Sequence, residues 1–324
     1  MNILCFQGSP RKKGNTKDLL SMFVEQAKKY DATIEVIDVT KQNIQPCKEL
    51  IVCEKKGVCP IKDDMDKFIY KRIKNADIIV LASPVFFYSV TAQLKALIDR
   101  CQMFWGRKYK LKFEDPNSNL RTGLLLSCGA SGGKRLFEGL ELTAKIFFDA
   151  LSMQYSGSLT YRHIESPGQM VSHPTVKEDI QKAVKNLCEP FLTKKKILFV
   201  SEHDALKSLI ASAFFKFHDK GRFNVFTAGI NALEEIYPET VKVMLEKQLD
   251  LLYFSPVQID KLDKNSKYDH VVYFGKNNSK FDVKALKSEI WEVNSPKEIS
   301  LQSSRELRDS IEIKVKGLVS SLAI

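Results

Sequence analysis

The chain has 324 residues, which at about 150 residues per domain predicts two domains, each large enough to bury a core. Its composition, 44% hydrophobic and 27% charged with 15 glycines and 11 prolines, excludes collagen-like and wholly disordered proteins. The net charge is +11, and most of the excess falls in residues 1–190, which hold 29 basic and 21 acidic residues. No basic arm or basic helix with interleaved aromatic residues accompanies it, so we expect no nucleic-acid partner.

The start of the chain and its apolar segments predict a cytoplasmic protein without a membrane partner. Residues 1–6 carry no basic n-region, and the longest apolar run, 78–90, is shorter than a membrane span and is interrupted by Ser83-Pro84. The seven cysteines are an odd number, so we expect no disulfide framework.

Apolar runs alternate with helical patterns through the first 190 residues, which predicts a parallel sheet with crossover helices. The expected strands are 2–7, 33–38, 77–82, 121–127 and 153–161, and the expected helices are 16–29, 65–74, 91–103, 134–150 and 175–191. Five such strands make a doubly wound α/β fold, of which the flavodoxin-like strand order is one common form. The polar segment 108–119 is expected to be an exposed insertion.

A second, smaller α/β domain is expected after Lys194-Lys195-Lys196, where a new buried-strand pattern starts at Ile197. Its expected elements after that strand are helix 206–218, strand 224–228, helix 238–248, strand 270–274, a strand near 290–293 and helix 303–322. We therefore divide the chain into domains 1–192 and 193–324.

The loop after the first strand carries the groups that a phosphate needs. It reads Gly8-Ser9-Pro10-Arg11-Lys12-Lys13-Gly14-Asn15-Thr16, and a helix is expected directly after it. Backbone N–H groups, hydroxyls and a guanidinium therefore gather at the positive end of a helix. The loop is neither a Walker A loop nor G-x-G-x-x-G, which disfavours ATP and ordinary dinucleotide binding. The alternative is a solvated turn in which Asn15 or Thr16 only caps the helix.

Two more loops follow expected strands, at the sheet edge where open α/β folds bind ligands. The first, Ser83-Pro84-Val85-Phe86-Phe87, offers an apolar wall for a flat ring. The second, Ser127-Cys128-Gly129-Ala130-Ser131-Gly132-Gly133, has small residues that let a ligand approach the backbone closely. A phosphate loop, an aromatic wall and a glycine loop on one edge predict a site for flavin mononucleotide (FMN).

These segments, with Ser89-Val90-Thr91-Ala92-Gln93-Leu94-Lys95-Ala96-Leu97-Ile98-Asp99-Arg100, resemble the NADPH-dependent FMN reductase family and its iron–sulfur flavoprotein branch, over about residues 1–190. The resemblance implies a site for FMN made of Ser9, Arg11, Gly14, Asn15, Thr16, Pro84, Val85, Phe86, Phe87, Ser127 and Gly129. It also implies NAD(P)H as co-substrate and a homodimer. Tyr88 stands where the family usually has a small glycine.

The segment from Cys47 to Cys59 is similar to the cysteine loop of iron–sulfur flavoproteins, which holds a cluster through four thiolates. Cys47, Cys53 and Cys59 match, but Leu50 stands at the fourth place. Three ligands could hold a labile cluster, or a zinc with an outside ligand. We favour a metal-free lid over the flavin.

Residues 194–324 resemble the low-molecular-weight tyrosine phosphatases and arsenate reductases, whose first strand ends in a Cys-x5-Arg-Ser loop. Here Ser201 replaces the cysteine, Lys207 the arginine, and Ser295-Pro296 the general-acid Asp-Pro. Because thiolate, bidentate arginine and acid are all lost, we expect an inactive domain. His203 and Asp204 are candidate bases for Ser201, although adjacency in a loop does not supply that geometry.

The leading hypothesis is an FMN-dependent NAD(P)H oxidoreductase that passes electrons to a quinone, flavin, metal or protein acceptor. The cofactor carries this chemistry, so no acidic or basic catalytic residue is expected. The alternative is a non-catalytic flavin-binding electron carrier whose second domain is a docking module of pseudo-phosphatase type.

Overall fold

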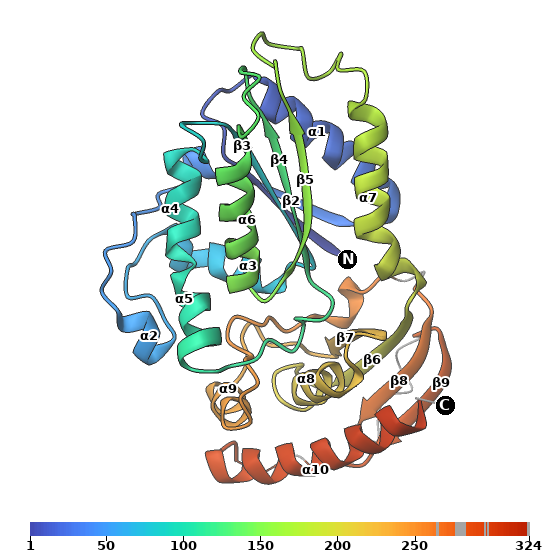
Figure 1. The fold of residues 1–324 in the computed structure, drawn as a ribbon. Helices are drawn as coiled ribbons and strands as arrows, with labels where there is room; N and C mark the ends of the chain where they lie inside the picture. Colours follow the sequence, from blue (N-terminus) through green and yellow to red (C-terminus); the bar gives the residue numbers. More distant parts are fainter. Residues whose placement is uncertain (264–265, 276–282, 295, 297, 323–324) are drawn as a thin grey trace. The chain divides into compact units, whose positions relative to one another are not determined.

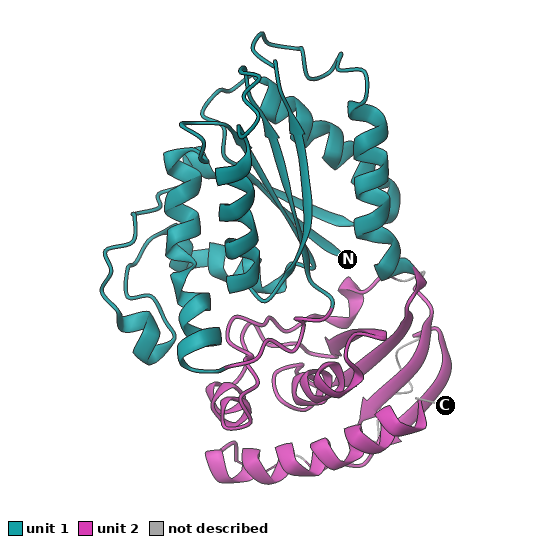
Figure 2. Ribbon diagram, viewed as in Figure 1, with its two compact units in different colours: residues 1–112, 120–192 teal, residues 113–119, 193–324 magenta. Residues whose placement is uncertain are grey.

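The structure is a computed structural model, and it describes residues 1–324 except 264–265, 276–282, 295, 297 and 323–324. The chain divides into two compact units (Figure 2). Unit 1 contains residues 1–112 and 120–192, and unit 2 contains residues 113–119 and 193–324.

Unit 1 is built on a five-stranded parallel sheet with the order β2-β1-β3-β4-β5 (Figure 1). The strands are β1 (Asn2–Gln7), β2 (Thr33–Asp38), β3 (Ile78–Pro84), β4 (Thr122–Cys128) and β5 (Gln154–Tyr161). Strands β1, β3 and β4 are almost wholly buried, as expected for a sheet covered by helices on both faces. This strand order is the flavodoxin-like one, so the predicted fold class is confirmed.

Helices cover both faces of this sheet. One layer contains α1 (Asn15–Ala27) and α7 (Val176–Thr193), and the other contains α3 (Tyr70–Asn75), α4 (Ala92–Arg100), α5 (Gln102–Trp105) and α6 (Glu138–Ala150), as Figure 1 shows. Helix α1 forms because Leu19, Phe23 and Ala27 recur on one face and are fully buried against the sheet. The short helices are α2 (Val52–Lys56), 3₁₀ turns at Lys28–Tyr30 and Val39–Lys41, and π-helical turns at Met65–Ile69 and Gly106–Lys110.

Three predictions for residues 1–192 are wrong in detail. The helix expected over 91–103 is broken at Cys101 into α4 and α5, and the helix expected from 134 begins at Glu138 after a series of turns. The expected exposed insertion 108–119 is also not exposed throughout. Residues 113–119 belong to unit 2, in which Glu114 N donates to Gln248 O at 2.7 Å and the Asp115 side chain is buried.

Unit 2 is a four-stranded parallel sheet with the order β7-β6-β8-β9. Its elements are β6 (Lys195–Ser201), α8 (Lys207–Asp219), β7 (Phe223–Gly229), α9 (Pro238–Leu245), a 3₁₀ turn at Ile259–Lys261, β8 (Tyr268–Phe274), β9 (Ala285–Trp291) and α10 (Leu301–Ser321). Strand β9 begins several residues before the predicted 290–293. It is an edge strand with a polar centre, Lys287-Ser288-Glu289, so the sequence contains no apolar run from which its start could be predicted.

In the described residues, we find no helix with the length and apolar character that a membrane crossing needs.

Candidate functional site

The loop between β1 and α1 is held by its own polar groups. Gln7 Nε2 donates to Ser9 O and Gln7 Oε1 accepts from Ser9 N, both at 3.2 Å, while Ser9 Oγ accepts from Arg11 N at 3.3 Å. Gly14 caps α1 without a side-chain hydrogen bond. The loop therefore presents backbone N–H groups at the positive end of a helix with the exposed Arg11 close by, an arrangement that suits an anion.

Asn15 and Thr16, both predicted to bind the phosphate, are buried and have partners inside unit 1. Asn15 Nδ2 donates to Ser166 O at 2.9 Å, and Asn15 Oδ1 accepts from Met170 N at 3.1 Å. Thr16 Oγ1 lies 3.4 Å from Cys128 Sγ. These side chains hold the segment after β5 and the end of β4 against α1. A phosphate contact at these two positions stays a prediction.

A two-residue turn follows β3 and exposes aromatic side chains. Phe86 and Ser89 exchange both backbone hydrogen bonds at 2.9 Å, and the residues between them, Phe87 and Tyr88, have φ values of 48° and 60°. Positive φ at both central positions defines a type I′ turn, which normally uses glycine or asparagine. An L residue there costs about 1–2 kcal/mol, so the backbone at Tyr88 favours glycine. Phe87 is fully exposed at the tip of the turn.

Pro84, Val85 and Gly129 lie where β3 and β4 end side by side. Pro84 is paired with Cys128 in the sheet register. A Cβ on Gly129 would lie 3.1 Å from Val85 Cγ2 and 3.0 Å from Leu136 Cδ2. Glycine therefore allows the loops after the two strands to pack closely.

Buried hydroxyls connect the loops at this edge. Thr91 Oγ1 donates to Gly8 O at 2.6 Å, and Thr91 N donates to Ser83 Oγ at 3.2 Å. Ser127 Oγ donates to Ser83 O at 2.7 Å. The predicted site residue Ser127 is wholly buried, so in this structure it supports the edge from inside, and its contact with a cofactor stays a prediction.

The glycine loop is shaped in part by Arg162, which the sequence analysis did not single out. Arg162, directly after β5, donates from Nε to Gly133 O at 3.1 Å and from Nη2 to Lys134 O at 3.0 Å. A Cβ on Gly133 would lie 3.6 Å from Tyr88 Oη, so Tyr88 reaches from the aromatic turn toward this loop. The available signal was the position of Arg162 at the end of the last strand, at the same sheet edge.

Two buried arginines anchor the cysteine loop, which we define as residues 46–61. Arg100 and Asp63 form an ion pair with both side chains fully buried, and Arg100 also donates to Ile61 O at 3.3 Å. Although burial opposes it, the hydrogen bond from Arg100 lowers the pKa of Asp63. Arg107 donates to Gly57 O at 2.9 Å from the other side. The loop is thus shaped by contacts of the protein itself.

The cysteine donors do not form a four-thiolate set. Cys47 is exposed, while Cys53 and Cys59 are partly buried. Burial, together with the neighbouring Cys59, raises the pKa of Cys53 and so disfavours its thiolate. Leu50 occupies the fourth place, and in the described part of the chain no three His, Cys, Asp or Glu side chains are grouped so as to hold a metal ion. The residues present therefore do not fit a cluster of the iron–sulfur flavoprotein type.

In unit 2, the loop between β6 and α8 is organised around a buried carboxylate. Asp204 accepts hydrogen bonds from Ser208 Oγ at 2.6 Å, from Thr227 Oγ1 at 3.0 Å and from Val257 N at 2.8 Å. Burial raises the pKa of Asp204 to about 6. Ser201 Oγ lies 2.7 Å from Ser208 Oγ, so the carboxylate and Ser201 are connected through Ser208. A negative charge inside this loop opposes the binding of an oxyanion.

The sequence analysis also matched Lys207 and Ser295 to positions of the phosphatase site and named His203 as a candidate base for Ser201. Lys207 Nζ lies 3.4 Å from Val293 O, and burial lowers the pKa of this ammonium group. His203 Nδ1 lies 3.0 Å from Asn231 O, so this ring nitrogen is directed at a backbone carbonyl. Ser295, predicted at the general-acid position, lies outside the described residues.

The sheet order and the three edge loops define unit 1 as a flavodoxin-like α/β domain with a candidate cofactor edge. The model of the NADPH-dependent FMN reductase family matches residues 1–161, just under half of the chain. The family likeness therefore concerns the N-terminal part.

Curated relatives match the same part. An iron–sulfur flavoprotein of Methanocaldococcus jannaschii is 36% identical over 131 residues, covering 40% of this chain and 63% of the relative. One from Methanosarcina thermophila is 34% identical and covers 40% and 64%. An oxidoreductase of Bacillus subtilis, described as NAD(P)H-dependent and FMN-containing, is 28% identical and covers 48% and 82%. The chain thus spans less than two thirds of the two archaeal relatives.

Solved structures give weaker likenesses. An NAD(P)H:quinone oxidoreductase from Methanothermobacter marburgensis is 17% identical with a TM-score of 0.46, covering 58% of this chain and 96% of that one. An arsenate reductase in the phosphate-binding state is 24% identical with a TM-score of 0.36, covering 39% and 98%.

Proposed function

We propose that unit 1 binds FMN at the carboxyl edge of its sheet and catalyses the oxidation of NAD(P)H, passing electrons to a quinone, flavin, metal or protein acceptor. The observation that carries the proposal is the meeting of three loops on one edge, within residues matched by the FMN reductase family. The phosphate-type loop follows β1, the aromatic turn follows β3, and the glycine loop follows β4. In an open α/β sheet this edge is where ligands bind.

The residues present fit FMN. The N-terminus of α1 and Arg11 would hold the phosphate, and the exposed Phe86 and Phe87 would pack against the flat ring and limit the access of water to it. When bound, FMN supplies a hydride acceptor and an onward electron donor. The chain's own part is to position and shield the ring. The hydroxyls of Thr91 and Ser127 support this by holding the edge loops together.

The test combines flavin content with turnover. Protein loaded with FMN is assayed for NADPH oxidation in the presence of a quinone. Arg11→Ala is expected to weaken FMN binding by a factor of about 10 to 150, because it removes a charge-assisted contact worth about 1.5–3 kcal/mol. Lys29→Ala, at an exposed position in the 3₁₀ turn that follows α1, is the matched control and should leave FMN binding unchanged. A protein that cannot be loaded with FMN would contradict the proposal.

The second candidate function is a non-catalytic flavin-binding electron carrier with unit 2 as a pseudo-phosphatase docking module. It is favoured by the loop of residues 201–208, where Ser201 and Lys207 replace the reactive pair and Asp204 places a carboxylate inside. FMN-loaded protein that can be reduced chemically but does not turn over NADPH would support the carrier.

A homodimer is also part of the proposal, and the family likeness is its support. Light scattering on the purified full chain tests it, and a monomer at micromolar concentration would contradict it.

A further inference from the structure

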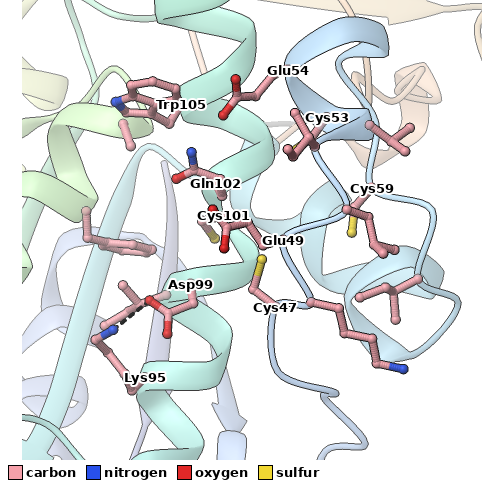
Figure 3. A pocket seen from close by; sticks show the side chains of 18 of the residues that line it. Cys47, Glu49, Cys53, Glu54, Cys59, Lys95, Asp99, Cys101, Gln102 and Trp105 are labelled. Carbon is pink, nitrogen blue, oxygen red and sulfur yellow. Dashed lines mark hydrogen bonds and ion pairs between the residues drawn. The ribbon is translucent and has the colours of Figure 1, made fainter.

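Unit 1 contains a cavity of about 660 Å³ that none of the functions above uses (Figure 3). Three parts of unit 1 line it: the cysteine loop, the continuous segment α4–α5, and α6. A cavity of this size lies within the range of 300–1,000 Å³ that is typical of small-molecule sites.

The walls of this cavity are mainly apolar. Leu50 and Ile51 of the cysteine loop are 53% and 49% exposed, and Leu142 and Ile146 of α6 are 63% and 55% exposed. Phe147 is buried and also lines the cavity. About half of the surface of these four large apolar side chains is in contact with water. A ligand that covers them would gain free energy by removing this apolar surface from water.

The charged groups at this cavity do not favour an anion. The lining contains two lysines, Lys48 and Lys95, against three acidic residues, Glu49, Glu54 and Asp99. Lys95 Nζ lies 2.7 Å from Asp99 Oδ1, a pair that Figure 3 shows at one end of the cavity. Lys95 is therefore already neutralised, and the lining holds no excess of positive charge for a phosphate or carboxylate.

Two residues of the lining, one with a planar ring and one with an amide group, indicate which class of ligand the cavity suits. Trp105 offers an indole ring, and Gln102 one turn before it offers an amide, as Figure 3 shows. In the part of the chain that the structure describes, the Gln102 side chain makes no hydrogen bond within the protein. An amide N–H donor beside an aromatic ring suits a flat molecule that carries a carbonyl oxygen.

We propose that this cavity is a binding site for an uncharged, planar aromatic molecule with a carbonyl group. The cysteine loop then serves as an apolar wall. Leu50, which stands where related loops have a cluster ligand, contributes ring-packing surface in place of a thiolate. The proposal goes beyond the proposed function and does not require FMN to be bound.

The experiment uses the full chain and two probes of nearly the same size and shape. 2-Acetylnaphthalene is uncharged and carries a carbonyl, whereas 2-naphthoate has the same ring system with a negative charge. We expect calorimetric titration to give micromolar binding of 2-acetylnaphthalene, at least tenfold tighter than that of 2-naphthoate. Equal binding of the two probes, or no binding of 2-acetylnaphthalene at 100 µM, would overturn the proposal.

Two variants locate the binding in the cavity. Ile146→Asp places a carboxylate in the apolar wall and should weaken 2-acetylnaphthalene at least tenfold, since the bound ring would desolvate the charge. Ile313→Asp, the same change at a position of α10 that is 73% exposed, should leave the affinity unchanged. Thr143→Trp, which fills the cavity from α6, should abolish binding even if the first variant unfolds.

The competing occupant of this surface is a second copy of the chain. The oligomeric state of the wild type and of the two Asp variants tests this alternative. If Ile146→Asp converts a dimer into a monomer and the wild-type dimer binds no probe, this surface is an interface between copies and the proposal is wrong. Probe binding with an unchanged oligomeric state in both Asp variants supports it.

Discussion

Replacing the buried Asp204 by Asn is expected to stabilise unit 2 at neutral pH. Burial raises the pKa of Asp204 from 3.8 to about 6, which means that the folded state binds this proton more tightly than the unfolded state does. The free energy of unfolding therefore falls as the pH rises from about 4 to about 7. At about 1.4 kcal/mol per pKa unit, the loss reaches about 3 kcal/mol at pH 7.

The hydrogen bonds of Asp204 can be kept by Asn. The Asn oxygen can accept from Thr227 Oγ1 and Val257 N, as one carboxylate oxygen does now. The Asn amide then faces Ser208 Oγ, which can accept this hydrogen and turn its own toward Ser201. We expect Asp204→Asn to be about 1–3 kcal/mol more stable than the wild type at pH 7.5 and close to it at pH 4.

Urea unfolding at several pH values measures this difference, and tryptophan fluorescence can report unit 2 alone. In a Trp105→Phe background only Trp291 remains, and its ring packs against Phe199 and Phe274, with centroid distances of 6.1 and 5.6 Å. Asp260→Asn, at an exposed position of the same unit, is the control. The reasoning would be refuted if the difference in the free energy of unfolding between Asp204→Asn and wild type did not change between pH 4.5 and 7.5. It would also be refuted if the variant were less stable than wild type at pH 7.5.

Three further predictions concern unit 1. Replacing Arg100 by Met should lower the free energy of unfolding by about 3–5 kcal/mol in a denaturant titration, because Asp63 is left buried without its partner; a loss below 1 kcal/mol would contradict the anchoring role. Asn15→Ala should cost about 1–3 kcal/mol and increase hydrogen exchange at Met170 N, whose acceptor it removes, and unchanged exchange there would argue against this tie. Leu50→Cys completes a four-thiolate set, so anaerobic reconstitution with iron and sulfide should yield more bound iron per chain than wild type, measured by metal analysis; equal iron would mean that the missing thiol is not the cause of the poor fit.

The sequence was most informative where local pattern alone decides structure. Strand 2–7 was predicted with the bounds that β1 has, because a buried parallel strand is a short apolar run between helical patterns. Strand 33–38 was also predicted with the bounds of β2, although β2 is an edge strand, because Ile34, Val36 and Ile37 give it a recognisable apolar content. Strand β9 was misplaced because its centre, Lys287-Ser288-Glu289, is polar and offers no such pattern. The break at Cys101 was missed because residues 91–103 contain neither glycine nor proline, so no local signal indicates it.

The site was predictable at the level of loops, and less so at the level of atoms. The order of strand and loop along the chain was enough to place Ser9, Pro84 and Gly129 at one sheet edge. The partner of Asn15 lies 151 residues away, at Ser166, and such long-range pairing cannot be obtained from one sequence. For the same reason, the sequence could suggest Asp204 as a base but could not predict its connection to Ser201 through a third residue.

The anchoring of the cysteine loop separates its shape from its chemistry. Arg100 and Arg107 fix the two arms of the loop through Asp63 and a backbone carbonyl, and neither contact involves a sulfur atom. Because these contacts do not involve the cysteine side chains, we expect single substitutions of the cysteines to leave the backbone conformation of the loop unchanged. A loop held in this way can carry Leu at position 50, rather than a thiol, and offer that surface to a different ligand.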